Sequence, residues 1–184
     1  MNCVLLMIEH GATDWNRGLN SACHEGRIDC ARLMIEKGAT DFERGVRTAC
    51  SSPHMNCVLL MVEKGATNWN AGLANACQNG RTECARLMIA CGATDIEVGL
   101  WYACKWGHIE CVRLMVENGA ITFDDGLRNA CCGGHMDCVL LMIAHGATDF
   151  DKGLSWACWY KHKECAQLMI AHGANHTAAS TFIG

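Results

Sequence analysis

A segment of 27 residues recurs six times along this chain, and that period constrains the fold more than any other feature of the sequence. The first copy, GATDWNRGLNSACHEGRIDCARLMIEK, begins at Gly11. A fixed period of about 20 to 50 residues is typical of stacked repeat proteins, in which each unit buries its apolar face against its neighbours. We therefore predict a single repeat array over residues 1–184. It comprises a half repeat (1–10), six full repeats (11–37, 38–64, 65–91, 92–118, 119–145 and 146–172) and a C-terminal tail (173–184).

Each repeat is predicted to contain two short helices. A Thr-x-x-Glu pattern, as in Thr40 with Glu43 and Thr94 with Glu97, is typical of a capping box at a helix start. A glycine-containing turn such as His24–Arg27 follows, and the second helix then carries an apolar arc over more than half of its circumference. No stretch alternates with the period of two that a strand requires. The predicted fold is all-α, a helix-turn-helix solenoid.

Aromatic residues near the start of the first helices share a helical face with small and apolar residues, so we predict that they are buried. They are Trp15, Phe42, Trp69, Phe123 and Phe150.

The charge pattern argues against nucleic acid and membranes as partners. The net charge is −4, only 18% of residues are charged, and both signs are interspersed. The longest apolar runs, such as 57–62, are far shorter than the ~20 residues that cross a bilayer. We expect a soluble protein without a secretion signal.

The cysteines indicate a reducing compartment. There are 15, an odd number, and all except Cys91 and Cys132 fall at two positions of the repeat. Regular helical positions are not where small secreted scaffolds place their disulfides, and a small apolar side chain would serve equally well there. We expect a cytoplasmic or nuclear protein.

The segment Leu100–Ala120, LWYACKWGHIECVRLMVENGA, resembles the ankyrin repeat. The likeness extends over residues 1 to about 174. It is most specific in the turn, with Ala103, Cys104, Gly107 and His108, and in the closing Gly-Ala pair.

Two departures from the family stand out. A Gly-Leu or Gly-Val pair, as in Gly18-Leu19, replaces the Thr-Pro-Leu-His opening, and the period is about six residues shorter than the family's ~33. The resemblance therefore implies shortened inter-repeat loops in place of projecting β-hairpins, with binding by the first helices. The short period is similar to that of ankyrin-like arrays of large DNA viruses, which would place the protein in a host cell.

The family resemblance implies recognition of a protein or peptide on the concave surface of the first helices. Positions that vary between repeats carry aromatic residues in repeats four and six, while repeat five between them is small and polar. This pattern predicts a shallow groove with aromatic walls, because exposed aromatic anchors are typical of interface hot spots. The predicted partner-binding residues are Trp101, Tyr102, Lys105, Trp106, Arg128, Asn129, Trp156, Trp159 and Tyr160. The alternative is that some rings, especially those of Trp156 and Trp159, cover the end of the array.

A metal site is a rival interpretation, because Cys, His and Cys recur at matching positions in four repeats and are good zinc ligands. The sets are Cys50-His54-Cys57, Cys104-His108-Cys111, Cys131-His135-Cys138 and Cys158-His162-Cys165. Arg27 and Arg81 take the histidine position elsewhere, which favours a hydrogen-bond donor there, and the resemblance implies that this histidine contacts neighbouring turns. We predict neither a metal nor a cofactor.

The sequence shows no phosphate loop, nucleophile elbow or carboxylate pair of the kind that catalysis requires, so we predict a non-enzymatic interaction scaffold. The alternatives are a structural module of a larger protein and a zinc-binding or thiol-redox repeat protein.

The two ends depart from the repeat. Residues 1–10, MNCVLLMIEH, resemble a second helix without its first, and self-association through this half repeat is predicted because its apolar face is not replaced by polar residues. In the tail, Phe182 and Ile183 are expected to cover the last helices.

Overall fold

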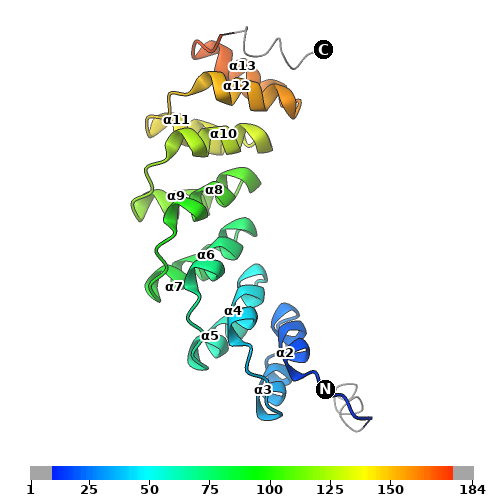
Figure 1. The fold of residues 1–184 in the computed structure, drawn as a ribbon. Helices are drawn as coiled ribbons and strands as arrows, with labels where there is room; N and C mark the ends of the chain where they lie inside the picture. The colour runs from blue at the N-terminus through cyan, green and yellow to red at the C-terminus, as the bar shows by residue number, and fades with distance from the viewer. Residues whose placement is uncertain (1–9, 176–184) are drawn as a thin grey trace. The chain divides into compact units, whose positions relative to one another are not determined.

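The structure of the protein, a computed structural model, describes residues 10–175, and in that range it contains twelve α-helices and no strand (Figure 1). Each repeat contributes one helical pair. The all-α helix-turn-helix repeat fold predicted from the sequence is thereby confirmed. The helices are α2 (Trp15–His24), α3 (Ile28–Glu36), α4 (Phe42–Ser51), α5 (Met55–Glu63), α6 (Trp69–Gln78), α7 (Thr82–Ala90), α8 (Ile96–Trp106), α9 (Ile109–Glu117), α10 (Phe123–Gly133), α11 (Met136–Ala144), α12 (Phe150–Trp159) and α13 (Lys163–Ala171).

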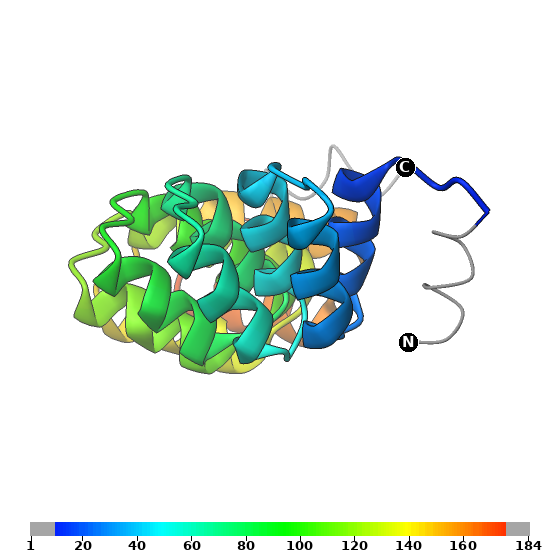
Figure 2. The ribbon, with the colours of Figure 1, turned by 90° about the horizontal axis from the view of Figure 1, so that it is seen from below.

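The chain divides into two compact units. The first comprises residues 1–76 and 83–94, and the second comprises residues 77–82 and 95–184. In the first unit α2 packs on α3 and α4 on α5, while α2 also contacts α4 and α3 contacts α5. Seen from below, these helices lie side by side (Figure 2).

The second unit contains the pairs α8–α9, α10–α11 and α12–α13. Its first helices form a row in which α10 contacts both α8 and α12, and its second helices form a parallel row in which α11 contacts both α9 and α13. This arrangement matters for function because one face of three successive first helices becomes a continuous surface.

The predicted Thr-x-x-Glu capping box is wrong. The helices start one residue later than it requires, and the N-cap is the residue after the threonine. Asp41 Oδ1, for example, accepts a hydrogen bond from the backbone N–H of Arg44 at 3.1 Å, and Asp14 and Asp149 do the same for Arg17 and Lys152. Aspartate is a better N-cap than threonine, which explains the shift.

The glutamate of the expected box reaches forward to the next repeat instead of back to its own helix start. The Glu43 carboxylate accepts hydrogen bonds from the backbone N–H of Thr67 at 2.9 Å and of Asn68 at 2.8 Å. Glu97 binds Ile121 and Thr122 in the same way. The corresponding side chain also binds the next loop in the other repeats, from Asn16, Asn70, Asp124 and Asp151. The short inter-repeat loop is thus held by a side chain of the preceding repeat.

A glycine in each first helix lies against a methionine of the second helix in the same repeat. A Cβ atom at Gly126 would lie 2.4 Å from Met142 Sδ and 3.4 Å from Cys104 Sγ of the preceding repeat. Met142 and Cys104 are both fully buried. The same contact recurs at Gly18, Gly45, Gly72, Gly99 and Gly153. The glycine therefore makes room for a sulfur-rich core.

The aromatic residues at the helix starts are half-buried, so the prediction that they are buried was wrong in degree. Phe123 stacks on His145 with ring centroids 5.4 Å apart, and Phe150 stacks on His172 at 5.0 Å. Each ring lies at the first residue of its helix, where the core is already open to solvent on one side.

Two predictions concern residues outside the described range. Self-association through residues 1–10 and coverage of the last helices by Phe182 and Ile183 both depend on the ends of the chain and stay predictions. Within residues 10–175, no helix is long and apolar enough to cross a membrane.

Replacing Gly126 with alanine should lower the free energy of unfolding by about 1–3 kcal/mol, because the added methyl group overpacks the core at Met142. This loss is expected even though alanine is intrinsically better than glycine in a helix by about 1 kcal/mol. Urea denaturation measures it. In a Met142→Ala background the added methyl group has space, and the same substitution should no longer destabilise; an equal penalty in both backgrounds would contradict the proposed contact.

Removing the Glu97 carboxylate should loosen the following loop. Glu97→Ala is expected to lower the free energy of unfolding by about 1–2 kcal/mol, since it leaves backbone donors without their acceptor. Glu110→Ala is the matched control, because Glu110 is exposed and lies 3.8 Å from Arg113 in a surface ion pair, and it should change stability by less than about 0.5 kcal/mol.

The Glu97 contribution should also depend on pH. Partial burial alone would raise the pKa of Glu97, but the hydrogen bonds from Thr122 and Ile121 hold this pKa below its ordinary value of 4.5. A carboxylate with a depressed folded-state pKa stabilises the protein above the unfolded pKa, and this stability is lost as pH falls through the folded pKa. The stability difference between wild type and Glu97→Gln should therefore be present at pH 6 and shrink toward pH 3. A difference that is constant across this range would show that charge at Glu97 is irrelevant.

Candidate functional site

Five positions of each first helix in the second unit point to the same side, because they are spaced i, i+3, i+4, i+7 and i+8. We call this surface the first-helix face. It consists of Val98, Trp101, Tyr102, Lys105 and Trp106 on α8, of Asp125, Arg128, Asn129, Cys132 and Gly133 on α10, and of Lys152, Ser155, Trp156 and Trp159 on α12 with Tyr160 directly after this helix. Eight of the nine predicted partner-binding residues lie on it with exposed or half-buried side chains.

The α8 portion of the face is an aromatic cluster. Trp101 and Tyr102 meet edge to face with ring centroids 4.6 Å apart, and Lys105 Nζ lies 4.8 Å from the centroid of Trp101. A cation at this distance is attracted by the negative face of the indole ring. Trp106, one turn further along, is 50% exposed. These contacts hold the rings and the ammonium group in fixed positions.

A hollow of about 410 Å³ lies between α8 and α10. It is lined mainly by apolar atoms, with Val98, Trp101 and Tyr102 on one side and Gly126 on the other. Glu97, Thr122 and Asp125 complete its lining. The sequence does not predict this hollow, because a glycine recurs at the position of Gly126 in every repeat.

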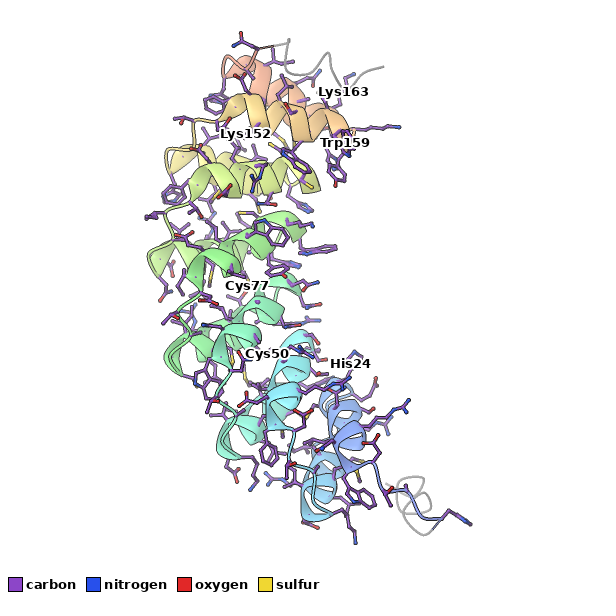
Figure 3. The ribbon with its side chains drawn as sticks, viewed as in Figure 1. His24, Cys50, Cys77, Lys152, Trp159 and Lys163 are labelled. Carbon is purple, nitrogen blue, oxygen red and sulfur yellow. The ribbon has the colours of Figure 1, made fainter. Side chains whose placement is uncertain are left out.

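The α12 portion carries a second aromatic cluster. Trp156 and Tyr160 stack almost in parallel, with an interplanar angle of 11° and centroids 5.9 Å apart. Trp159 is 59% exposed, and Figure 3 places it at the opposite end of α12 from Lys152. The electrostatic interaction with the neighbouring Cys132 side chain, together with the hydrogen bond between the two groups, raises the pKa of Tyr160. The phenol thus links the end of α12 to Cys132 of α10.

The α10 portion between the clusters carries no aromatic residue, and one of its polar side chains, that of Asn129, is buried. Asn129 is buried, 6% exposed, and its amide donates a hydrogen bond to the backbone carbonyl of Asp125 at 2.7 Å. The side chain of Asn129 is thus used within its own helix, and its contact with a partner stays a prediction. Arg128 remains at the surface, paired with Asp125 Oδ1 at 2.9 Å.

In several repeats a histidine contacts the turn of the preceding repeat. His108 Nε2 lies 3.1 Å from the carbonyl oxygen of Gln78, and His162 Nε2 lies 3.1 Å from that of Cys132. These carbonyl groups belong to the last turn of a first helix, and carbonyl groups there have no hydrogen-bond donor within the helix. This is the role that the family resemblance implied for the histidine.

The histidine ring requires a glycine beneath it. Gly107 has φ 74°, and a Cβ atom there would lie 2.4 Å from His135 Nδ1. Gly26, Gly80 and Gly134 meet the following histidine in the same way. Burial lowers the pKa of His135, so its ring is neutral near pH 7. The signal for this contact in the sequence is a glycine followed by a histidine 28 residues later.

The cysteines pair across repeats instead of grouping with the histidines. A hydrogen bond from the Cys77 thiol lowers the pKa of Cys111 to about 7, whereas burial raises the pKa of Cys138 to about 11. Cys111 is fully buried, so it lacks the exposure of a reactive thiol. In residues 10–175, no group of three or more His, Cys, Asp or Glu side chains is placed to hold a metal ion.

Comparison with known proteins identifies the repeat. The family model described as "Ankyrin repeats (3 copies)" matches residues 46–126 and 100–180. The chain belongs to the ankyrin repeat family. Ankyrin repeats are generally protein–protein interaction modules and are typically non-enzymatic.

A solved structure of the human ASB11 ankyrin repeat domain is similar to this chain. The two share 25% sequence identity over 85% of this chain and 84% of that chain, with a TM-score of 0.70. Among curated proteins, no relative matches this sequence significantly.

Replacing Gly107 with alanine should destabilise this ankyrin array more than the same change at Gly146. Both glycines have a left-handed backbone conformation, with φ 74° at Gly107 and 98° at Gly146. Nothing lies within 4 Å of a Cβ atom built at Gly146. Gly146→Ala should therefore show only the backbone strain of about 1–2 kcal/mol. Gly107→Ala should lose at least a further 1 kcal/mol or so through the clash with His135.

Thermal and urea denaturation of both variants measure this difference. In a His135→Ala background the two substitutions should have similar effects. If the excess penalty of Gly107→Ala persisted there, the histidine contact would not be its cause.

Proposed function

We propose that the first-helix face of α8, α10 and α12 binds a protein or peptide partner without catalysing a reaction on it. The observation that carries this proposal is the pair of exposed aromatic clusters on one helical face, separated by the small residues of α10. Tryptophan and tyrosine are enriched at interface hot spots because one rigid ring buries a large apolar area.

Trp106 and Trp159 are the main anchors in this proposal. They expose 50% and 59% of their surfaces at the same end of their helices. The alternative that Trp156 and Trp159 only cover the end of the array does not account for the α8 cluster, which lies two repeats before the end of the described helices.

The proposed localisation is a reducing compartment, either the cytoplasm or the nucleus. Fourteen cysteines form no disulfide in the part of the chain that the structure describes, and most are buried in the core. Nucleic acid and membrane are not proposed as partners.

The double variant Trp106→Ala/Trp159→Ala should lose at least tenfold in affinity for peptides selected on the wild-type protein, because it removes both anchors. A random 12-residue phage-displayed library supplies these peptides, and fluorescence anisotropy measures their Kd. The melting temperature should change by only a few degrees, since both rings are exposed.

The matched control is Ile121→Ala/Leu140→Ala, which removes two exposed apolar side chains, 76% and 50% exposed, outside the face. It should retain the affinity of the wild type. Equal loss in both double variants, or no loss in either, would refute binding through the first-helix face.

A further inference from the structure

The first-helix positions are charged differently from the rest of the chain. The chain has 15 Lys and Arg and 19 Asp and Glu residues. On the first-helix face, three cations, Lys105, Arg128 and Lys152, stand against one carboxylate, Asp125. The corresponding positions of α2, α4 and α6, considered separately, carry Arg17, Arg44, Arg47 and only Glu25. An acidic protein therefore presents cations where it presents its aromatic rings.

The three cations of the first-helix face are held in place by their neighbours. Arg128 Nη2 lies 2.9 Å from Asp125 Oδ1, and Lys152 Nζ lies 2.6 Å from Asp149 Oδ2. Lys105 is held over the Trp101 ring, and no carboxylate among the described residues forms an ion pair with it. Its ammonium group therefore keeps its capacity to bind an incoming carboxylate.

The hollow between α8 and α10 and this lysine share one residue, Trp101. Trp101 forms part of the wall of the hollow, and the face of its ring also contacts the ammonium group of Lys105. A volume of about 410 Å³ with a mainly apolar lining is large enough for one bulky apolar side chain. An apolar group in the hollow and a carboxylate on Lys105 would come from residues about two or three positions apart in an extended segment.

We propose that the partner is an acidic peptide segment, with one bulky apolar residue in the hollow and a nearby Asp or Glu on Lys105. This inference rests on the proposed function and adds the charge and the anchor of the partner. Three cations, one on each helix and two of them already paired with carboxylates, are too dispersed for the continuous phosphate backbone of a nucleic acid, which is bound by clustered basic residues. Lys105, which forms no ion pair with a carboxylate among the described residues, suits a single peptide carboxylate close to an apolar side chain.

The composition of selected peptides tests the proposal directly. Peptides enriched from the random 12-residue library on the wild-type protein should carry a net negative charge and a Leu, Ile, Met, Phe or Trp close to an Asp or Glu. Charge reversal with Lys105→Glu/Lys152→Glu should weaken their binding at least tenfold. Binding to the wild type should also weaken as the salt concentration rises.

The matched control Arg86→Glu/Arg113→Glu makes the same change of net charge at exposed arginines of second helices, away from the first-helix face. It should leave the affinity within about twofold of the wild type. A similar loss in this control would show a general effect of net charge and would overturn the proposal.

A measurement without any partner tests the local charge. In a Trp15→Phe/Trp69→Phe background the four remaining tryptophans all lie on the first-helix face. Iodide should quench their fluorescence more strongly than caesium does, and Lys105→Glu/Lys152→Glu should reverse that order. Equal quenching by the two ions would overturn the inference.

The outcomes separate this inference from the function on which it rests. Neutral or basic peptides that require Trp106 and Trp159 would overturn the inference and leave the proposed function standing. A library that yields no binder that depends on these tryptophans would overturn both. Tighter binding of a 15-nucleotide oligothymidine than of any peptide would overturn both in favour of a nucleic-acid partner.

Discussion

The close approach of a first-helix glycine to a second-helix methionine underlies every repeat. Because Gly126 has no side chain, Met142 can lie across the helix and touch it, and Cys104 of the preceding repeat fills the remaining space. At this contact the core is therefore made of small and flexible groups, since methionine adapts to irregular gaps and cysteine acts as a small apolar residue. Trp106 and Trp159 lie outside this core and are exposed.

The short loops depend on a second contact, in which a polar side chain near the start of one first helix accepts hydrogen bonds from the next loop. In the longer repeats of the family this connection would include a hairpin. Here Glu43 and Glu97 satisfy the loop donors from the preceding repeat. Residues that a helix-capping pattern assigns to their own helix thus act between repeats, and the loop is ordered without strands.

Periodicity was sufficient to predict the helices, the turn and most of the surface residues, because a repeat exposes the same positions each time. Contacts between repeats were not predictable in the same way. The reach of Glu97 to residues 121 and 122 depends on the direction of its side chain, which the Thr-x-x-Glu pattern does not specify. Likewise Asn129 is polar and variable among repeats, as a surface residue would be, yet its amide binds within α10 and is buried. The hollow arises from the packing of two helices and has no pattern of its own.

The match between a turn glycine and the following histidine affects how such arrays can be rearranged. Gly80, Gly107 and Gly134 each lie beneath the histidine of the next repeat, whereas Pro53 precedes Arg81 instead. Repeats are thus not interchangeable, because each junction depends on two residues that belong to different repeats. Excising repeat five would place the Gly107 turn against His162 and preserve a compatible junction. Excising repeat three would place Pro53 against His108, so unequal recombination within the coding sequence is tolerated at some junctions and disfavoured at others.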